Sequence, residues 1–297
     1  GAGDDTFTLN DGAVVIGGID AGSATTADTL QVNNATGLAF NAAGFSGFER
    51  LTKTNIGLLA LAGAQAYSAG VEIMGGTLDV DGTLDTGSVT MADGTTLNVD
   101  GTVQAAGAAP TAISGSAGIN TVLVNAGATL NANGDLGDGS DVVTVAGTLD
   151  TGASALSLGA GDDTFTLSDG AVISGTGIDG GAATTADVLV LDNAIALAFD
   201  GGMTGGFEQL IKQNGGTATM TGSQAFADTA IQGGTLDVDG TLATDTLGLA
   251  DGTALNVDGA VRGAAATQAV MTGSAGVNTV TVGAGGSLLA AGDLGDG

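Results

Sequence analysis

The 297-residue chain has no cysteine, no histidine and no tryptophan, and Pro110 is its single proline. Without histidine or cysteine it has no imidazole base, no thiol nucleophile and no Cys/His zinc cluster. The lack of cysteine does not by itself define a redox compartment. These absences exclude several classes of enzyme and metalloprotein before any motif is considered.

Positive charge is also scarce. Four basic residues stand against 32 acidic ones, which gives a net charge of −28. A chain this negative repels phosphate, so we expect no nucleic-acid partner. Apolar stretches are interrupted throughout by glycine, serine, threonine and asparagine, so the sequence predicts no direct membrane insertion of this segment.

What the chain does contain is repetition. The sequence GAGDDTFTL at residues 1–9 returns at residues 159–167, an offset of 158. GGTLDVDGTL at residues 75–84 returns at residues 233–242, and GDLGDG at residues 134–139 returns at residues 292–297. Such long internal repeats indicate a repeat architecture. We therefore divide the chain into a first repeat, residues 1–158, and a truncated second repeat, residues 159–297.

A finer period runs inside each repeat. The pattern Thr-Leu-x-Val-Asp-Gly occurs at residues 77–82 and 96–101, which are 19 positions apart. Short runs that alternate apolar and polar residues are bounded by Asp-Gly, Gly-Gly or Asn-Gly turns, as in β-strands. A period of about 20 residues matches one turn of a β-solenoid. The sequence predicts an all-β, parallel β-helix of about 15 rungs, with both repeats in one continuous rod.

Aromatic residues recur at matching positions in the two repeats. We expect them to fill the core of wider rungs, although an aromatic platform for a ligand is the alternative. The matching residues are Phe7, Phe40, Phe48 and Tyr67 in the first repeat, and Phe165, Phe199, Phe207 and Phe226 in the second.

Three consecutive motifs in each repeat resemble the autotransporter-associated β-strand repeat. In the first repeat they are FERLTKT at residues 48–54, LALAGAQAY at 59–67 and GGTLDV at 75–80. The second repeat carries FEQLIK at residues 207–212, TGSQAF at 221–226 and GGTL at 233–236. The match is limited to these motifs, and the remaining rungs resemble the passenger domains of type V secreted proteins only in their general sequence character.

The resemblance implies a right-handed parallel β-helix that is exported through an outer-membrane barrel. It implies a bacterial cell-surface adhesin, self-association module or stalk, extracellular and anchored to the outer membrane through a region absent here. The implied partners are other copies of the protein or surface receptors, including glycans. The chain begins without a leader and ends within a repeated motif, so we expect it to be a piece of a longer tandem array.

Two acidic motifs suggest a cation site. Residues 137–143 and 159–165 follow the G-x-G-x-D-x-U core of calcium-binding nonapeptide repeats. Their central residues, Asp141 and Asp163, are 22 positions apart, so they could stack at one corner and offer oxygen ligands to calcium. Contiguous motifs nine residues apart are missing, however, and glycine and aspartate also serve turn geometry. We assign no metal or cofactor residues, and calcium binding stays open.

Catalysis finds little support in the sequence. The glutamates are Glu49, Glu72 and Glu208, and most aspartates belong to Asp-Gly turns. A pair of carboxylates for glycoside hydrolysis is expected once per protein, whereas most of these acids occur in both repeats. We therefore expect a non-enzymatic surface rod, with no catalytic residues. The alternatives are a calcium-stiffened S-layer or biofilm-matrix protein and a polysaccharide-active β-helix enzyme.

Overall fold

The computed structural model describes residues 1–41 and 44–295. It is all-β, with 57% of residues in strands and 2% in helices, and it forms a parallel β-solenoid of about 14 turns. The predicted parallel β-helix is confirmed, with a turn count close to the expected one. Residues 296–297, which end the second copy of GDLGDG, lie outside the described residues.

The chain divides into two compact units. The first contains residues 1–159 and 174–176, and the second contains residues 160–173 and 177–297. No helix in the described residues is long and apolar enough to cross a bilayer. The prediction of one continuous rod stays a prediction.

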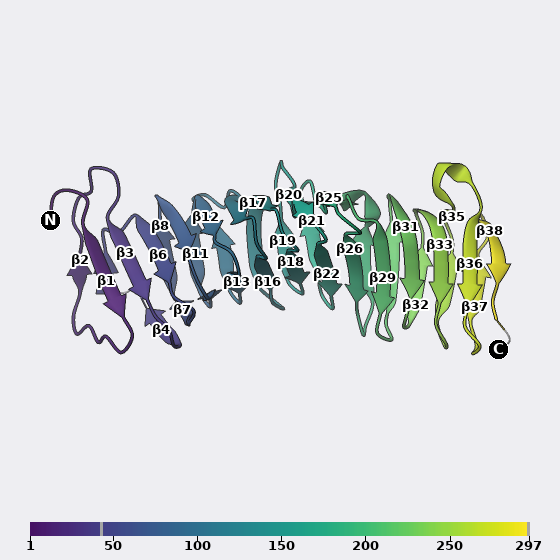
Figure 1. Ribbon diagram of the computed structural model, residues 1–297, viewed down its shortest axis with the longest axis horizontal. Coiled ribbons are helices and arrows are strands. Elements are labelled where there is room, and N and C mark those ends of the chain that lie inside the picture. The colour runs from purple at the N-terminus through teal and green to yellow at the C-terminus, as the bar shows by residue number, and fades with distance from the viewer. Residues whose placement is uncertain (42–43, 296–297) are drawn as a thin grey trace. The chain divides into compact units, whose positions relative to one another are not determined.

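Strands of the first unit stack in parallel columns, and neighbours in a column come from successive turns of the chain (Figure 1). The first column is β1 (Thr6–Asn10), β3 (Thr29–Asn33), β6 (Arg50–Thr54), β9 (Gly70–Ile73), β12 (Ser88–Met91), β15 (Thr111–Ser116), β17 (Thr129–Gly137) and β20 (Leu156–Ser157). The second is β4 (Leu38–Asn41), β7 (Leu58–Ala62), β10 (Thr77–Val80), β13 (Thr96–Val99), β16 (Thr121–Val124) and β18 (Val142–Val145). The third is β8 (Ala64–Tyr67), β11 (Thr83–Thr86), β14 (Thr102–Gln104), the start of β17, and β19 (Thr148–Asp150). The short strands β2 (Ile19–Asp20) and β5 (Phe45–Ser46) also pair.

The second unit repeats this arrangement. Its longest column is β22 (Thr164–Ser168), β26 (Val188–Asp192), β29 (Gln209–Gln213), β31 (Ser223–Ile231), β33 (Thr241–Leu249), β36 (Ala269–Gly273) and β38 (Ser287–Asp293). A second column is β27 (Leu197–Asp200), β30 (Thr217–Thr221), β32 (Thr235–Val238), β34 (Ala254–Val257) and β37 (Thr279–Val282). The other elements of this unit are β21 (Ala160–Gly161), β24 (Ile178–Asp179), β25 (Ala182–Ala183), β28 (Thr204–Gly205), β35 (Ala260–Arg262), and the short helices η2 (Gly201–Met203) and η3 (Ala264–Ala266). The last residue of β23 (Val172–Ser174) belongs to the first unit.

Like residues stack on like residues inside each unit. Leu78 pairs with Leu97, which pairs in turn with Val122. In β10 and β13 the apolar residues are fully buried, whereas the threonines and the polar residues between them are partly exposed. In β16 the two valines are buried, and Thr121 and Leu123 are partly exposed. Because strand side chains alternate between two faces, the Thr-Leu-x-Val pattern builds a continuous apolar interior. In the second unit Leu236 and Leu255 pair in the same way.

The aromatic residues join this interior, as expected. Phe165 is fully buried, and its ring stacks on Phe207 with centroids 6.1 Å apart. The other matched aromatic residues are buried as well, except Phe7, which is half-buried. Its ring lies 6.5 Å from that of Phe48. The aromatic residues therefore act as core fillers.

Glycines at one turn allow successive backbones to stack closely. A Cβ atom added to Gly82 would lie 1.9 Å from the carbonyl oxygen of Gly63, and one added to Gly101 would lie 2.0 Å from that of Gly82. The same carbonyls accept the amide hydrogens of the next strand, including that of Thr83. Any side chain at these turns would therefore separate two hydrogen-bonded rungs.

Turn length varies as well, and one example lies in the first unit. Thr83 pairs with Thr102, and Ser88 pairs with Ala112. Residues 83 and 88 are therefore five positions apart, whereas their partners on the next rung, residues 102 and 112, are ten positions apart. The extra residues form an outward loop, which an antiparallel bridge between residues 105 and 109 closes. The second unit carries η3 in the corresponding loop.

Candidate functional site

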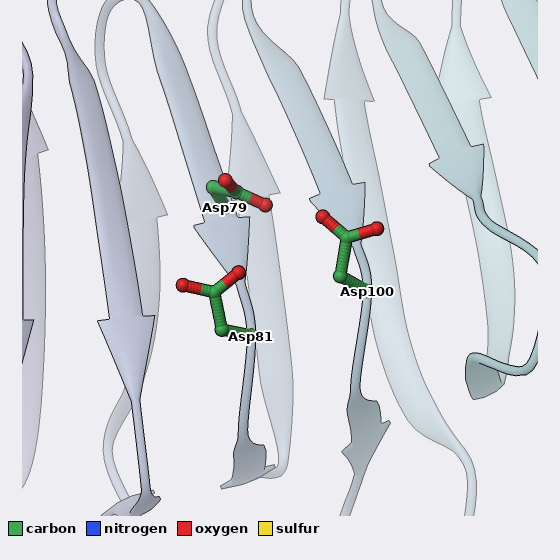
Figure 2. A group of neighbouring side chains, drawn as sticks. All are labelled: Asp79, Asp81 and Asp100. Atoms are coloured by element: carbon green, nitrogen blue, oxygen red, sulfur yellow. The ribbon is translucent and has the colours of Figure 1, made fainter.

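A group of three carboxylates forms where the repeated Thr-Leu-x-Val-Asp-Gly pattern stacks on itself. Asp79 lies in β10, Asp81 follows that strand, and Asp100 follows β13 on the next rung (Figure 2). One oxygen atom from each of the three lies within 4.8 Å of the other two. We call these residues the first acidic cluster. The 19-residue register brings Asp100 beside Asp81, and Asp79 points outward because its strand neighbours Leu78 and Val80 point inward.

Two asparagines partly compensate this negative charge. The Asn98 side-chain amide donates to Asp79 Oδ1 at 2.7 Å and to Asp100 Oδ2 at 3.0 Å. Asn125 donates to Asn98 Oδ1 at 2.8 Å and to Asp100 Oδ1 at 2.7 Å. Burial raises the pKa of Asp79, and the charges of Asp81 and Asp100 raise it further against the effect of the Asn98 hydrogen bond.

The second unit contains the equivalent cluster. Asp237, Asp239 and Asp258 also place their oxygens within 4.8 Å of one another. Burial raises the pKa of Asp237, and the charges of Asp239 and Asp258 add to that effect. Gly283 stands where the first unit has Asn125, and a Cβ atom at this position would lie 1.8 Å from Asp258 Oδ1. The second cluster therefore lacks the outer amide donor of the first.

Chemically, the acidic clusters concentrate negative charge at the same place in each unit. Carboxylate oxygens are the ligands that calcium prefers, but Asp81 and Asp100 are exposed, and amide hydrogens already occupy both oxygens of Asp100. Such a group attracts cations weakly and without strong selectivity, because exposed charges are screened by water and salt.

Asp141 and Asp163, the residues of the predicted calcium corner, are both almost fully buried. Asp141 Oδ1 accepts the amide hydrogen of Asn120 at 2.6 Å, and the amide of Asp163 donates to Asp187 Oδ1 at 2.8 Å. Asp141 belongs to the first unit and Asp163 to the second, and their stacking stays a prediction. Each of these two aspartates therefore takes part in a hydrogen bond between rungs, which gives the predicted calcium motif a structural role.

The neighbouring acid of the second motif also has a structural role. Asp162 Oδ1 accepts the amide hydrogens of Thr184 at 3.0 Å and Thr185 at 2.6 Å, and the Thr184 hydroxyl at 2.8 Å. These hydrogen bonds lower the pKa of Asp162. The side chain thus connects one rung to the turn of the next, which agrees with the turn interpretation of the motif.

The three glutamates all make structural contacts. Glu72 accepts a hydrogen bond from Arg50 at 2.7 Å. Glu49 accepts the amide hydrogen of Asp28 at 2.9 Å, and Glu208 accepts that of Asp187 at 2.8 Å. These contacts give the glutamates a role in rung stacking. The expectation that the chain is not an enzyme stays a prediction.

Sequence reasoning did not identify the acidic clusters. The signal was present in the two copies of Thr-Leu-x-Val-Asp-Gly 19 residues apart, since equal spacing places their final aspartates on neighbouring rungs. No protein-family model matches the chain, and no curated protein or solved structure is significantly similar to it.

Proposed function

We propose that the protein is a bacterial cell-surface repeat protein whose solenoid provides reach, display and adhesion. The observation that carries this proposal is the recurrence of one outward face in both units. Thr77 and Asp79 project from β10 between buried neighbours, and Thr235 and Asp237 project in the same pattern from β32. A surface that presents the same group repeatedly can bind weakly at each copy and strongly in sum.

The resemblance to autotransporter passenger domains supports the same proposal. It favours export across the outer membrane and an extracellular location, with anchoring through a region outside residues 1–297. The partners we propose are other copies of the protein, surface receptors or glycans. Repeating strands with a buried apolar interior and a polar exterior suit a stalk, because length grows by adding rungs without a new core.

Display on cells tests this function. The chain is fused to an outer-membrane anchor in a bacterium that does not aggregate, and settling and attachment to epithelial cells are measured. We expect faster settling or stronger attachment than with the anchor alone. Raising the salt concentration should strengthen contact between displaying cells, because it screens the repulsion between acidic surfaces. Unchanged settling and attachment, together with turnover of a polysaccharide, would instead favour an enzyme.

A further inference from the structure

Three acids of the second unit lie on successive rungs, each directly before a strand of the same column. They are Asp163 before β22, Asp187 before β26 and Glu208 before β29. Asp187 Oδ1 accepts the amide hydrogen of Asp163 at 2.8 Å, and a Glu208 carboxylate oxygen accepts that of Asp187 at 2.8 Å. We call these three residues the carboxylate column.

Asp187 lies at the middle of this column in an unfavourable place for a charge. Its side chain is fully buried, and Oδ2 has no hydrogen-bond partner within the described part of the chain. The groups that act on it electrostatically are Asp163, Glu208 and Asp162, all acidic. The ammonium of Lys212, on the following strand β29, is held by the carbonyls of residues 213, 214 and 233. A buried carboxylate surrounded by like charges favours its neutral form.

We propose that Asp187 takes up a proton from solvent in mild acid and thereby makes the second unit more stable at acidic than at neutral pH. The neutral carboxyl group keeps Oδ1 as the acceptor for the Asp163 amide and carries the proton on Oδ2, the oxygen without a partner. Uptake removes one buried negative charge from a column of acids. The column is then a proton-binding device built into rung stacking.

The direction of the pH effect follows from the electrostatics. Burial raises the pKa of Asp187 from 3.8 to about 6; the Asp163, Glu208 and Asp162 charges add to this, and the hydrogen bond from the Asp163 amide opposes it. The folded chain therefore binds this proton about 100-fold more tightly than the unfolded chain. The added stability is complete below the unfolded pKa and is lost as pH rises through the folded pKa.

The composition makes this effect easy to isolate. The chain contains no histidine, and histidine is the side chain whose ordinary pKa lies between about pH 5 and 8.

The first unit also supplies a position that matches Asp187. Asp28 Oδ1 accepts the amide hydrogen of Asp5 at 2.6 Å, but the Asp5 side chain is 53% exposed and lies 3.2 Å from the terminal amine. Asp28 therefore has the same hydrogen bond without a buried acid on its preceding rung.

The test compares the whole chain with its Asp187→Asn, Asp28→Asn and Asp138→Asn variants. Urea unfolding is followed by circular dichroism, and amide exchange is measured for the segment that contains β26, between about pH 4.5 and 8. Asparagine keeps an acceptor oxygen at position 187 but cannot titrate. In the unmodified chain, we expect amide exchange in this segment to accelerate with rising pH by more than the intrinsic pH dependence of amide exchange. This excess acceleration should disappear only in Asp187→Asn. Asp138 is exposed, so its variant controls for net charge.

Two outcomes overturn the proposal. One is the same excess pH dependence in Asp187→Asn as in the unmodified chain, because general repulsion would then be its source. The other is a calcium-specific protection of β26 at pH 8 that Asp187→Asn abolishes, because the column would then hold a metal ion. Carboxyl carbon NMR of the unmodified chain gives an answer even if Asp187→Asn fails to fold. An aspartate resonance that titrates near pH 6 supports the proposal, and titration of every aspartate below about pH 5 contradicts it.

Discussion

Lys53 and Lys212 occupy the same position in the two repeats, and both side chains are fully buried. The Lys53 ammonium donates to the carbonyl oxygens of Thr54, Asn55 and Gly75 at 3.0, 2.7 and 2.9 Å. Lys212 donates to three carbonyls in the same arrangement. Burial lowers the pKa of Lys53 to about 8, so the side chain is still mainly protonated at pH 7. Each lysine acts as a tethered cation that joins two rungs.

Removing this cation should be costly. Lys53→Met deletes three hydrogen bonds and leaves buried carbonyl groups without a partner, so we expect a loss of about 3 kcal/mol in the free energy of unfolding. Arg50→Met is the control on the same strand. Arg50 pairs with Glu72 at a partly exposed site, so its loss should cost less than about 1 kcal/mol. Urea unfolding at pH 7 measures both, and equal stabilities of the two variants would contradict the structural role of Lys53.

Stacked turn glycines should tolerate no side chain. Gly82→Ala would place a Cβ atom 1.9 Å from the carbonyl oxygen of Gly63, and both backbones are held by the rungs around them. We expect a loss of about 3 kcal/mol in stability. Gly87→Ala is the control, because nothing lies within 4 Å of its added Cβ atom. Thermal unfolding compares the two, and a melting temperature of Gly82→Ala equal to that of Gly87→Ala would refute this packing.

Apolar stacking should dominate the core energetics. Leu97→Ala removes a fully buried side chain between Leu78 and Val122, which should cost about 2–5 kcal/mol in the free energy of unfolding. Ile56 is 80% exposed, and Ile56→Ala should change stability by less than about 0.5 kcal/mol. Chemical denaturation of both variants checks this contrast, which a small effect of Leu97→Ala would contradict.

The acidic clusters should favour folding at low pH. The raised pKa of Asp79 means that the folded chain binds its proton more tightly, so the stability gained from that proton is lost as pH rises above the ordinary value of 3.8. Asp79→Asn should therefore stabilise the chain at pH 7, by less than about 1 kcal/mol, and the gain should vanish near pH 3.

A matched variant should show the opposite sign. The Ser274 hydroxyl and the Gly276 amide lower the pKa of Asp251. Its stabilising contribution is present at neutral pH and is lost as pH falls below 3.8. Asp251→Asn should therefore destabilise the chain at pH 7 and less so in acid. Urea midpoints at the two pH values measure both variants, and effects of the same sign at pH 7 would contradict these assignments.

Calcium should not be specifically required. The Asp141 and Asp162 carboxylates accept amide hydrogens that join neighbouring rungs, and the acidic clusters are largely exposed. We expect a chelator to leave the melting temperature unchanged, and calcium and magnesium to raise it equally through screening. Differential scanning calorimetry at constant ionic strength measures both effects. A rise specific to calcium, lost in Asp141→Asn, would establish the site that the sequence motif suggested.

The sequence predicted the features that depend on local periodicity. Alternation around Leu78 and Leu97 identified the strands and the buried face, and the 19-residue spacing identified stacking. The longer rung between Leu97 and Val122 was less visible, because its extra residues form a loop that leaves the register intact. The turn count therefore came out close to the predicted one, although the rungs differ in length.

Other features depend on three-dimensional packing. Lysine is normally exposed, so composition gave no reason to place Lys53 inside, although it follows Leu51 at strand spacing and therefore shares its inward face. Asp187 likewise belongs to no Asp-Gly turn, and its surroundings arise from residues on two other rungs. The acidic residues of the carboxylate column are 20 or more positions apart in the sequence. Their burial beside one another can therefore be recognised only once the stacking of the rungs is known.

The outward loops at residues 105–109 and around η3 have an evolutionary consequence. In the first unit the extra residues form a loop between β14 and β15, and this loop does not disturb the pairing of Ser88 with Ala112. Insertions at this place can therefore vary in length and sequence while the glycine turns stay invariant. Diversification among related proteins should concentrate in these loops, and a foreign peptide grafted there would be carried on an unchanged scaffold.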